Sequence, residues 1–354
     1  MLVVGDWLDR RVTRSIIVSA QGTRASPRSN LNQMSLQFVH SHDSPKSHEG
    51  EIWGIRWTAA NQVLSIGADG KAILWDPANG SPIRALNPHP LALISSSVDE
   101  AGKLALINSI EGTTYLWDLT NGDVVGKKES FERQSGAPEP AWSVSLHPQS
   151  ATYATSNASG SVNIFSAAAD TFGEHLQSIP TGRTKLGMCV THSPDGQRIA
   201  LSTEAGAIYL FDIESSSLTT TFSSHAMSVR SLAWSPDSQL LLSASDDKRL
   251  VLHDVRTASG GGKPGGGMVA SLSGHSSWVL SASLAADGRA AASGSADRTI
   301  KIWDLAARAC VSTIQEQGEI WGVSWKPNAG FGTGGFVSPG SEGCVRFWRS
   351  AGAG

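Results

Sequence analysis

The most constraining feature of this 354-residue chain is a short motif whose terminal aromatic residue returns every 42 to 50 residues. Its clearest copies are GADGKAILWD (67–76), ASDDKRLVLHD (244–254) and GSADRTIKIWD (294–304). Across the chain the aromatic position is held by Trp75, Trp117, Phe165, Phe211, His253, Trp303 and Trp348. Self-similarity at a fixed period of this size indicates an array of one supersecondary unit repeated along the chain.

Each unit consists of short runs rich in Val, Ile, Leu, Ser and Thr, separated by turn residues. SVRSLAW-SPDSQ-LLLSASDDKRLVLHD (228–254), for example, alternates strand-like runs with turns, and no stretch sustains a helical period. The period and the His…Asp…Trp-Asp pattern are typical of WD repeats. Seven four-stranded units predict an all-β fold, a seven-bladed WD-repeat β-propeller whose ring leaves only short strand edges.

The ring needs one strand that the last unit lacks, because the chain ends just after CVRFWRS (344–350). We predict that SLQFVHS (35–41) supplies it beside Phe347 and Trp348 and so covers an open strand edge. The propeller is expected over 34–350, with a tail at 351–354. Residues 1–33 are expected to be a disordered extension or a mis-annotated start ahead of Met34; an Arg-rich transit peptide is the alternative.

Charge and cysteine content exclude several classes of function. A net charge of −3 and a pI near 6.4 argue against gripping nucleic acid by bulk charge. Cys189, Cys310 and Cys344 lie far apart, which favours free thiols in a reducing compartment. No apolar run approaches the roughly 20 residues that cross a bilayer. We therefore expect a cytoplasmic protein, with the nucleus as a second location, that binds neither membrane nor nucleic acid directly.

A recurring set of polar residues resembles a catalytic triad but is better explained as structure. The copies are His48, Ser65, Asp69 and Trp75; His225, Ser243 and Asp247; and His275, Ser293, Asp297 and Trp303. A catalytic site would occur once, whereas a buried hydrogen-bond network that fixes each hairpin would be repeated. We predict this network, and we expect no catalytic residue, metal or cofactor; His40, His42 and His48 fit a linker better than a zinc site.

The network lacks one or more of its residues in some repeats. Repeat three has Ala137 and Ser159 at the His and Asp positions, and repeat four has Arg183 and Ala205. Repeats two and seven have Glu at the Asp position (Glu111 and Glu342). We expect the third and fourth blades to open more readily than the first and sixth.

A second set of residues lies where each unit's first strand begins, at positions that ring the mouth of the propeller channel. One column contains Trp53, Trp142, Arg230, Leu280 and Trp321, with Ile94 and Met188 in the remaining repeats. The column two residues earlier contains Glu51, Pro140, Ser228, Trp278 and Glu319. Core packing is the alternative for any single Trp, but Trp and Arg are favoured interface anchors. We predict a partner-binding site of Glu51, Trp53, Trp142, Arg230, Trp278, Leu280, Glu319 and Trp321, in which the acidic residues receive a basic side chain.

Several segments resemble one branch of this class, the WD-repeat subunit of the superkiller complex, which is also the meiotic-recombination WD-repeat family. They are SSHAMSVRSLAWSPDSQLLLSASDD (223–247), LSGHSSWVL (272–280), GSADRTIKIWDLAARACVSTI (294–314) and GEIWGVSW (318–325). The resemblance covers about residues 34–350 and is most specific in repeats five and six.

The resemblance implies a non-enzymatic scaffold. Its expected partners are the tetratricopeptide-repeat subunit and the DExH-type RNA helicase of the superkiller complex, which feed RNA to the cytoplasmic exosome for 3'-5' mRNA decay. It further implies binding to the meiotic topoisomerase-like cleavage protein in fungi, and a place in a transcription elongation complex in animals. The alternative is a generic WD-repeat adaptor, such as a ubiquitin-ligase substrate receptor.

Overall fold

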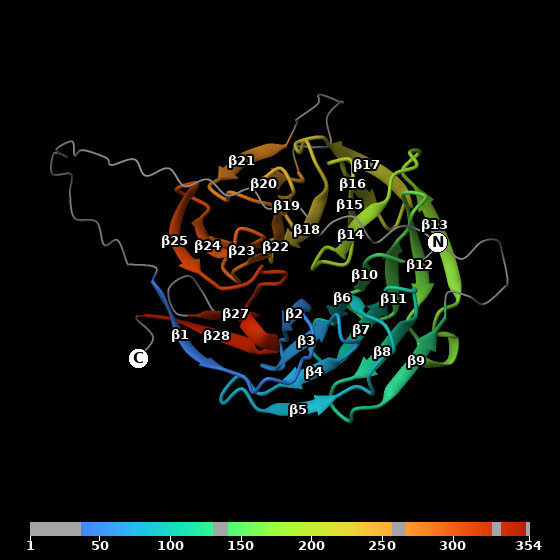
Figure 1. Cartoon of the computed structure of the whole chain (residues 1–354). Coiled ribbons are helices and arrows are strands. Elements are labelled where there is room, and N and C mark those ends of the chain that lie inside the picture. The colour runs from blue at the N-terminus through green and yellow to red at the C-terminus, as the bar shows by residue number, and fades with distance from the viewer. Residues whose placement is uncertain (1–36, 130–140, 257–266, 328–333, 352–354) are drawn as a thin grey trace. The chain divides into compact units, whose positions relative to one another are not determined.

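The computed structural model describes residues 37–129, 141–256, 267–327 and 334–351. Within these ranges the strands form seven antiparallel sheets of four strands each, arranged as blades around a common centre (Figure 1). This confirms the predicted all-β, seven-bladed propeller. Residues 1–33 and 352–354 lie outside the described residues, so the predictions for the N-terminal extension stay predictions.

The first three blades follow each other along the chain, and each runs from an inner to an outer strand. Blade 1 contains β2 (Ile52–Trp57), β3 (Val63–Gly67), β4 (Ala72–Trp75) and β5 (Pro82–Ala85). Blade 2 contains β6 (Leu93–Val98), β7 (Leu104–Ser109), β8 (Thr114–Asp118) and β9 (Val124–Lys128). Blade 3 contains β10 (Val144–Leu146), β11 (Thr152–Ser156), β12 (Ser161–Ser166) and β13 (His175–Pro180), with a 3-10 turn at Ala169–Thr171.

The next three blades repeat this order. Blade 4 contains β14 (Gly187–His192), β15 (Arg198–Thr203), β16 (Ile208–Asp212) and β17 (Ser217–Phe222). Blade 5 contains β18 (Val229–Trp234), β19 (Leu240–Ser245), β20 (Arg249–Asp254) and β21 (Met268–Ser273). Blade 6 contains β22 (Val279–Leu284), β23 (Ala290–Ser295), β24 (Thr299–Asp304) and β25 (Ala309–Gln315).

Blade 7 joins the two ends of the described chain. Its strands are β26 (Ser324–Trp325), β27 (Gly335–Pro339), β28 (Val345–Ser350) and β1 (Phe38–Asp43), with a 3-10 turn at Ser341–Gly343. β1 pairs with β28 so that His40 faces Trp348 and His42 faces Phe347. The predicted closing strand is therefore present, two to three residues later than the predicted range 35–41. Inner strand β2 in turn contacts β26 and β27, which closes the ring.

The tight turn between the second and third strands of a blade needs a left-handed residue. Gly70 has φ 74° in blade 1, and Lys248 and Arg298 have φ 71° and 64° at the same place in blades 5 and 6. A Cβ on Gly70 would meet the carbonyl oxygen of His89 at 1.9 Å. Gly70 is therefore required both by its backbone angle and by the close approach of the next blade.

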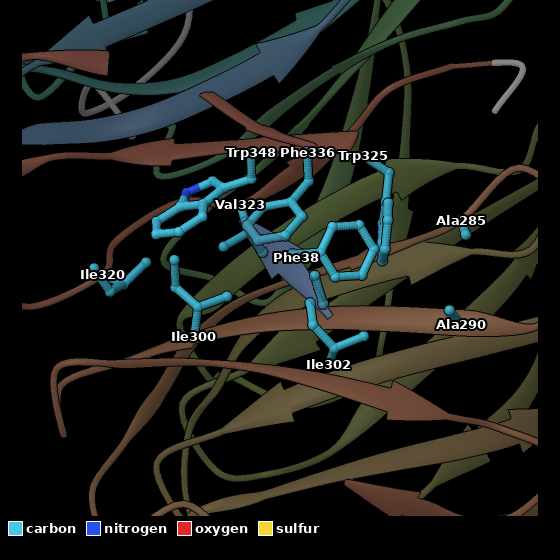
Figure 2. Packing of buried hydrophobic residues seen from close by; sticks show 11 residues of the cluster. Phe38, Ala285, Ala290, Ile300, Ile302, Ile320, Val323, Trp325, Phe336 and Trp348 are labelled. Atoms are coloured by element: carbon cyan, nitrogen blue, oxygen red, sulfur yellow. The ribbon is translucent and has the colours of Figure 1, made fainter. Parts of the chain in front are cut away.

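The core lies between neighbouring blades, where the two middle strands of each sheet are buried. At the contact of blades 6 and 7, Phe38 of β1 packs edge-on against Trp325 and Phe336, with 5.3 Å between ring centres in each pair. Phe336 in turn stacks on Trp348, and Ile300 and Ile302 of blade 6 complete this cluster (Figure 2). The first described strand thus fills a hole in the core of the last blade.

Neighbouring inner strands are also joined by serine hydroxyls, a feature that the repeat pattern did not predict. Backbone N–H groups of one inner strand donate to serine Oγ atoms of the preceding blade, as in Leu146 to Ser97 at 2.9 Å and Trp325 to Ser283 at 3.1 Å. The other acceptors of such bonds are Ser95, Ser143, Ser145, Ser231 and Ser324. These bonds satisfy donors on the inner strand edges, which face no further strand within their own sheet.

Cys189, Cys310 and Cys344 are all free thiols. Across the described ranges, we find no helix with the length and apolar character that crossing a membrane requires.

Candidate partner-binding site

The predicted column of mouth residues coincides with a backbone irregularity at the start of the inner strands. The register between the first and second strands shifts across Trp53, Arg230 and Leu280, and it shifts across Ile94 and Met188 in blades 2 and 4. A bulge leaves one residue of the strand unpaired and re-aims its side chain. Trp142 and Trp321 occupy the same sequence position ahead of β10 and β26. The repeat therefore places one variable side chain per blade at this end of the channel.

Four of the predicted residues meet where blades 1 and 7 join. The indole Nε1 of Trp53 donates to Glu51 Oε2 at 3.3 Å, and the rings of Trp53 and Trp321 lie 6.2 Å apart at 44°. Burial raises the pKa of Glu319, and the charge of Glu51 raises it further. The two carboxylates are thus close enough to repel each other, and an added cation would relieve this repulsion.

A pocket of about 400 Å³ opens at the same place. Its charged lining residues are Lys46, Glu49, Glu51, Glu319 and Glu342, and Trp321 forms part of its wall. Lys71 pairs with Glu49 at 2.8 Å, and the remaining carboxylates leave the pocket negative. The indole Nε1 of Trp321 is buried without a hydrogen-bond partner among the described residues. A pocket with acidic and aromatic walls suits a guanidinium or ammonium group.

Arg230 and Trp278 form a second group in blades 5 and 6. The guanidinium of Arg230 binds Asp246 through two nitrogens, Nε to Oδ1 and Nη2 to Oδ2, both at 2.9 Å. It also lies 5.7 Å from the ring centre of Trp278. Arg230 is therefore already neutralised, and it holds Trp278 in place more than it offers a free charge. Asp246 was not predicted from the sequence, although its place as an acidic residue directly after the second strand was a visible signal.

Two predicted residues behave differently from these groups. Leu280 does not fit the prediction of a partner contact, because only 6% of it is exposed. Trp142 is 39% exposed on blade 3, and Leu91 and Ile110 of blade 2 are exposed as well. Asn108 Nδ2 donates to Ala141 O at 2.7 Å, which brings the end of β7 beside Trp142. Leu91 and Ile110 were not predicted from the sequence; they lie in loops that vary between repeats.

The recurring polar set forms one chain of hydrogen bonds in each of three blades. In blade 6, His275 Nδ1 bonds Asp297 Oδ2 at 2.9 Å, His275 Nε2 bonds Ser293 Oγ at 2.7 Å, and Trp303 Nε1 donates to Ser293 Oγ at 2.8 Å. His48, Asp69, Ser65 and Trp75 repeat this arrangement in blade 1, and His225, Asp247 and Ser243 repeat it in blade 5.

The electrostatics of these networks are those of a structural element. Hydrogen bonds from Thr299 and His275 and from the Ser276 amide outweigh the opposing effect of burial, and they lower the pKa of Asp297 to about 2. Burial lowers the pKa of His275 despite its bond to Asp297, so the ring stays neutral at physiological pH. Each serine is enclosed by its own hairpin and is 0% exposed, as for Ser293. A substrate cannot reach a nucleophile buried in this way.

The histidines near the first blade are used by the fold. His40 bonds Asp43 at 2.8 Å, His42 stacks on Phe347 with ring centres 4.5 Å apart, and His48 belongs to the blade 1 network. In the described part of the chain, no group of three or more His, Cys, Asp or Glu side chains is placed to hold a metal ion.

Three of the sequence repeats match a known protein family. The family model "WD domain, G-beta repeat" matches residues 38–76, 216–254 and 266–304. Each match begins at the outer strand of one blade and ends at the third strand of the next, so a sequence repeat is offset from a blade by one strand. Blade 7 shows the same offset, because its outer strand β1 comes from the start of the first repeat.

Three curated relatives illustrate the range of similarity. Meiotic recombination protein rec14 from Schizosaccharomyces pombe is 26% identical over 90% of this chain and 99% of its own length. WD repeat-containing protein SL1-17 from Schistosoma mansoni is 29% identical over 60% of this chain and 69% of its own length. WD repeat-containing protein VIP3 from Arabidopsis thaliana is 30% identical over 56% of this chain and 64% of its own length. The matched repeats, the hydrogen-bond networks and the closed ring together show a seven-bladed propeller built from WD40 repeats, an architecture typical of scaffold proteins.

Proposed function

We propose that this chain is a non-catalytic adaptor that holds an extended segment of a partner protein at the channel mouth. The observation that carries the proposal is the acidic pocket between blades 1 and 7, with Trp53 and Trp321 beside it. A basic side chain of the partner enters this pocket, because Glu51 and Glu319 lie close enough there for the charge of one to raise the pKa of the other. Apolar side chains of the same segment then contact Trp278 on one side and Trp142 on the other.

The complex that we propose is the superkiller complex, in which the chain would support exosome-dependent cytoplasmic mRNA decay. Its partners there would be the tetratricopeptide-repeat subunit and the DExH-type helicase. The support is the sequence resemblance of 223–247, 272–280, 294–314 and 318–325. The similarity to rec14 over nearly the whole chain supports a second role, in forming meiotic double-strand breaks with the topoisomerase-like cleavage protein. These roles correspond to the cytoplasm and the nucleus, respectively.

The competing assignments use the same face with another ligand. A ubiquitin-ligase substrate receptor or a transcription-elongation subunit would also bind a peptide at the mouth of a propeller channel. Affinity purification with mass spectrometry separates these assignments, because each predicts a different set of co-purifying subunits.

The direct test uses the full chain and the purified helicase–tetratricopeptide pair. Trp278→Ala and Trp321→Ala should each weaken binding by roughly 2 kcal/mol or more, since Trp anchors dominate such interfaces. Leu218→Ala is the matched control, because Leu218 is 38% exposed on outer strand β17 and far from the mouth in its blade. Unchanged co-purification by both Trp variants refutes the mouth as the binding site.

A second pair of variants tests the charge of the partner. Glu51→Gln with Glu319→Gln should weaken binding and reduce its dependence on salt, because a charged contact is screened by ions. Binding of the double variant that is as tight and as salt-dependent as that of the original chain excludes a basic side chain in the pocket.

A further inference from the structure

A second cavity lies at the opposite end of the inner strands from the partner site. β2 begins beside Trp53 at the mouth and ends at Trp57, and the cavity includes Arg56, Trp57 and Thr58 together with the ends of β6, β14, β18 and β22. Its volume is about 290 Å³. Because five blades contribute to its wall, the cavity belongs to the central channel, which these inner strands surround (Figure 1).

Arg56 is the one cation among the described residues that line this cavity. Within the described ranges, no carboxylate lies within ion-pair distance of its guanidinium, and none of its nitrogens makes a hydrogen bond. Its charge acts on a residue of blade 4: burial raises the pKa of the Cys189 thiol, and the charge of Arg56 opposes that rise. Arg56 is exposed to the solvent of the channel, where an anion can reach it. A cation in a cleft walled by protein attracts anions more strongly than one on an open surface.

Two serine hydroxyls in the same wall are available as donors. Ser97 Oγ and Ser283 Oγ each accept a backbone N–H from the neighbouring blade, from Leu146 and Trp325. The bonds occupy oxygen lone pairs, so the hydroxyl hydrogens of both serines are left to donate into the cavity that they line.

The acidic residue of the lining, Asp99, makes no ion pair with Arg56 and is bound by other donors. Asp99 Oδ1 accepts the backbone N–H groups of Lys103 and Leu104, at 2.7 and 2.9 Å. Asp99 Oδ2 lies 3.5 Å from the Ser150 hydroxyl of blade 3, so both carboxylate oxygens face donors other than Arg56.

We propose that this end of the channel binds a single phosphate group, either free phosphate or the head of a small phosphomonoester. The planar guanidinium fork of Arg56 matches two phosphate oxygens, and a tetrahedral anion has further oxygens for Ser97 and Ser283 on other blades. A cavity of about 290 Å³ holds one such group and excludes a nucleic-acid strand. The site is separate from the mouth, so it does not depend on the proposed partner.

The test measures thermal stability of the full chain in inorganic phosphate, with chloride replacing phosphate to keep ionic strength constant. Phosphate should raise the melting temperature saturably, and Arg56→Gln should weaken the apparent affinity at least tenfold. Arg289→Gln is the matched control, because Arg289 is an exposed arginine at the start of β23, outside the cavity lining. Glycerol 3-phosphate, tested in parallel, distinguishes a phosphomonoester from the free ion.

Equal affinity of Arg56→Gln and the original chain for both probes overturns the proposal, as does the absence of a saturable effect on the original chain. Should Arg56→Gln fail to fold, Arg56→Lys answers the same question, since it keeps the charge but loses the guanidinium fork. It must bind phosphate more weakly than the original chain; equal binding overturns the proposal.

Discussion

At the residue scale, His253 shows how one blade keeps its network after losing the tryptophan. Its Nε2 lies 3.2 Å from Ser243 Oγ, where Trp75 and Trp303 place an indole nitrogen in blades 1 and 6. Because Asp247 accepts from His225 Nδ1, the remaining nitrogen of His225 accepts the Ser243 hydroxyl. His253 must then donate through Nε2, as an indole would.

The replacement leaves one cost and one compensation. The Nδ1 of His253 is buried without a hydrogen-bond partner among the described residues. Phe222 of β17 packs on the smaller imidazole ring, with 4.6 Å between ring centres. The space of the missing indole is thus filled from the preceding blade, which the repeat pattern does not reveal.

The buried imidazole makes stability depend on pH. Burial lowers the pKa of His253 to about 3, from 6.5 in the unfolded chain. Between pH 3 and pH 6.5, His253 takes up a proton only in the unfolded chain. The contribution of the neutral, buried His253 to the free energy of unfolding is therefore complete above pH 6.5, and it declines as the pH falls toward 3. Below pH 6, His253 should add about 1.4 kcal/mol per pH unit to the loss of unfolding free energy. Urea unfolding of His253→Gln between pH 7 and 4.5 should show a shallower slope by that amount.

His175→Gln is the control for this measurement, because His175 is exposed on β13. Burial also lowers the pKa of His192 to about 3. His192 therefore contributes its own part of the slope of unfolding free energy against pH in every variant. A slope for His253→Gln equal to that of the original chain would show that His253 is not held neutral in the fold.

At the element scale, β1 closes the ring through its backbone, its charges and one aromatic side chain. Beyond the pairing with β28, Arg346 binds Asp43 through Nε at 2.8 Å and Nη2 at 3.0 Å. Arg346 Nη1 also donates to the buried Glu316, which lies in the connection from blade 6 to blade 7, at 2.6 Å. Phe38 is 8% exposed and fills the aromatic cluster of blade 7 (Figure 2). The strand therefore contributes to both faces of the closing blade.

Removing this strand should destabilise the whole molecule, because an open ring exposes the edge of β28 and the aromatic cluster. A chain that begins after Asp43 should melt at a lower temperature than one that begins at Met34. The single change Phe38→Ala should cost about 3–5 kcal/mol of unfolding free energy, as for other buried aromatic residues.

Val39→Ala is the matched control for Phe38→Ala, because the adjacent side chain is 37% exposed and faces away from the cluster. Equal melting temperatures of the two truncated chains would contradict closure by β1.

At the scale of the whole molecule, stability is distributed unevenly around the ring. Blades 3 and 4 lack the His–Asp pair: Ser159 instead bonds Asn157, and Arg183 and Ala205 are exposed. Yet Ser143 and Ser145 of blade 3 accept N–H groups from blade 4, so these blades are well joined at the channel. The weakness is therefore expected in their second turns, at residues 157–160 and 203–206, and not in their inner strands.

Amide hydrogen exchange can resolve this pattern. Amides of the turns at 157–160 and 203–206 should exchange faster than those at 67–70 and 295–298, where the network is complete, because local opening breaks fewer bonds. Slower exchange in the turns of blades 3 and 4 than in those of blades 1 and 6 would contradict this account.

The period of the sequence was sufficient to predict the number of blades, their strand order and the closing strand, because each repeat folds through local hairpins. It also identified His275, Ser293, Asp297 and Trp303 as one group, since such a network lies almost entirely within one blade. For the partner-binding site, the sequence period identified a column of positions, but it could not show which of their side chains are available to a partner. Arg230 is ion-paired with Asp246, and Leu280 is buried, whereas Trp142 is exposed to solvent.

What only the tertiary structure decided is which blades face each other across the seam and the channel. Glu51 and Glu319 are 268 positions apart, and ring closure alone brings their charges together in one pocket. Arg56 and Cys189 likewise interact only because β2 and β14 line one channel. The physical reason is that a repeat encodes its own hydrogen bonds and apolar faces, whereas contacts between side chains of different blades depend on the closed ring and on which neighbours have already bound each charge.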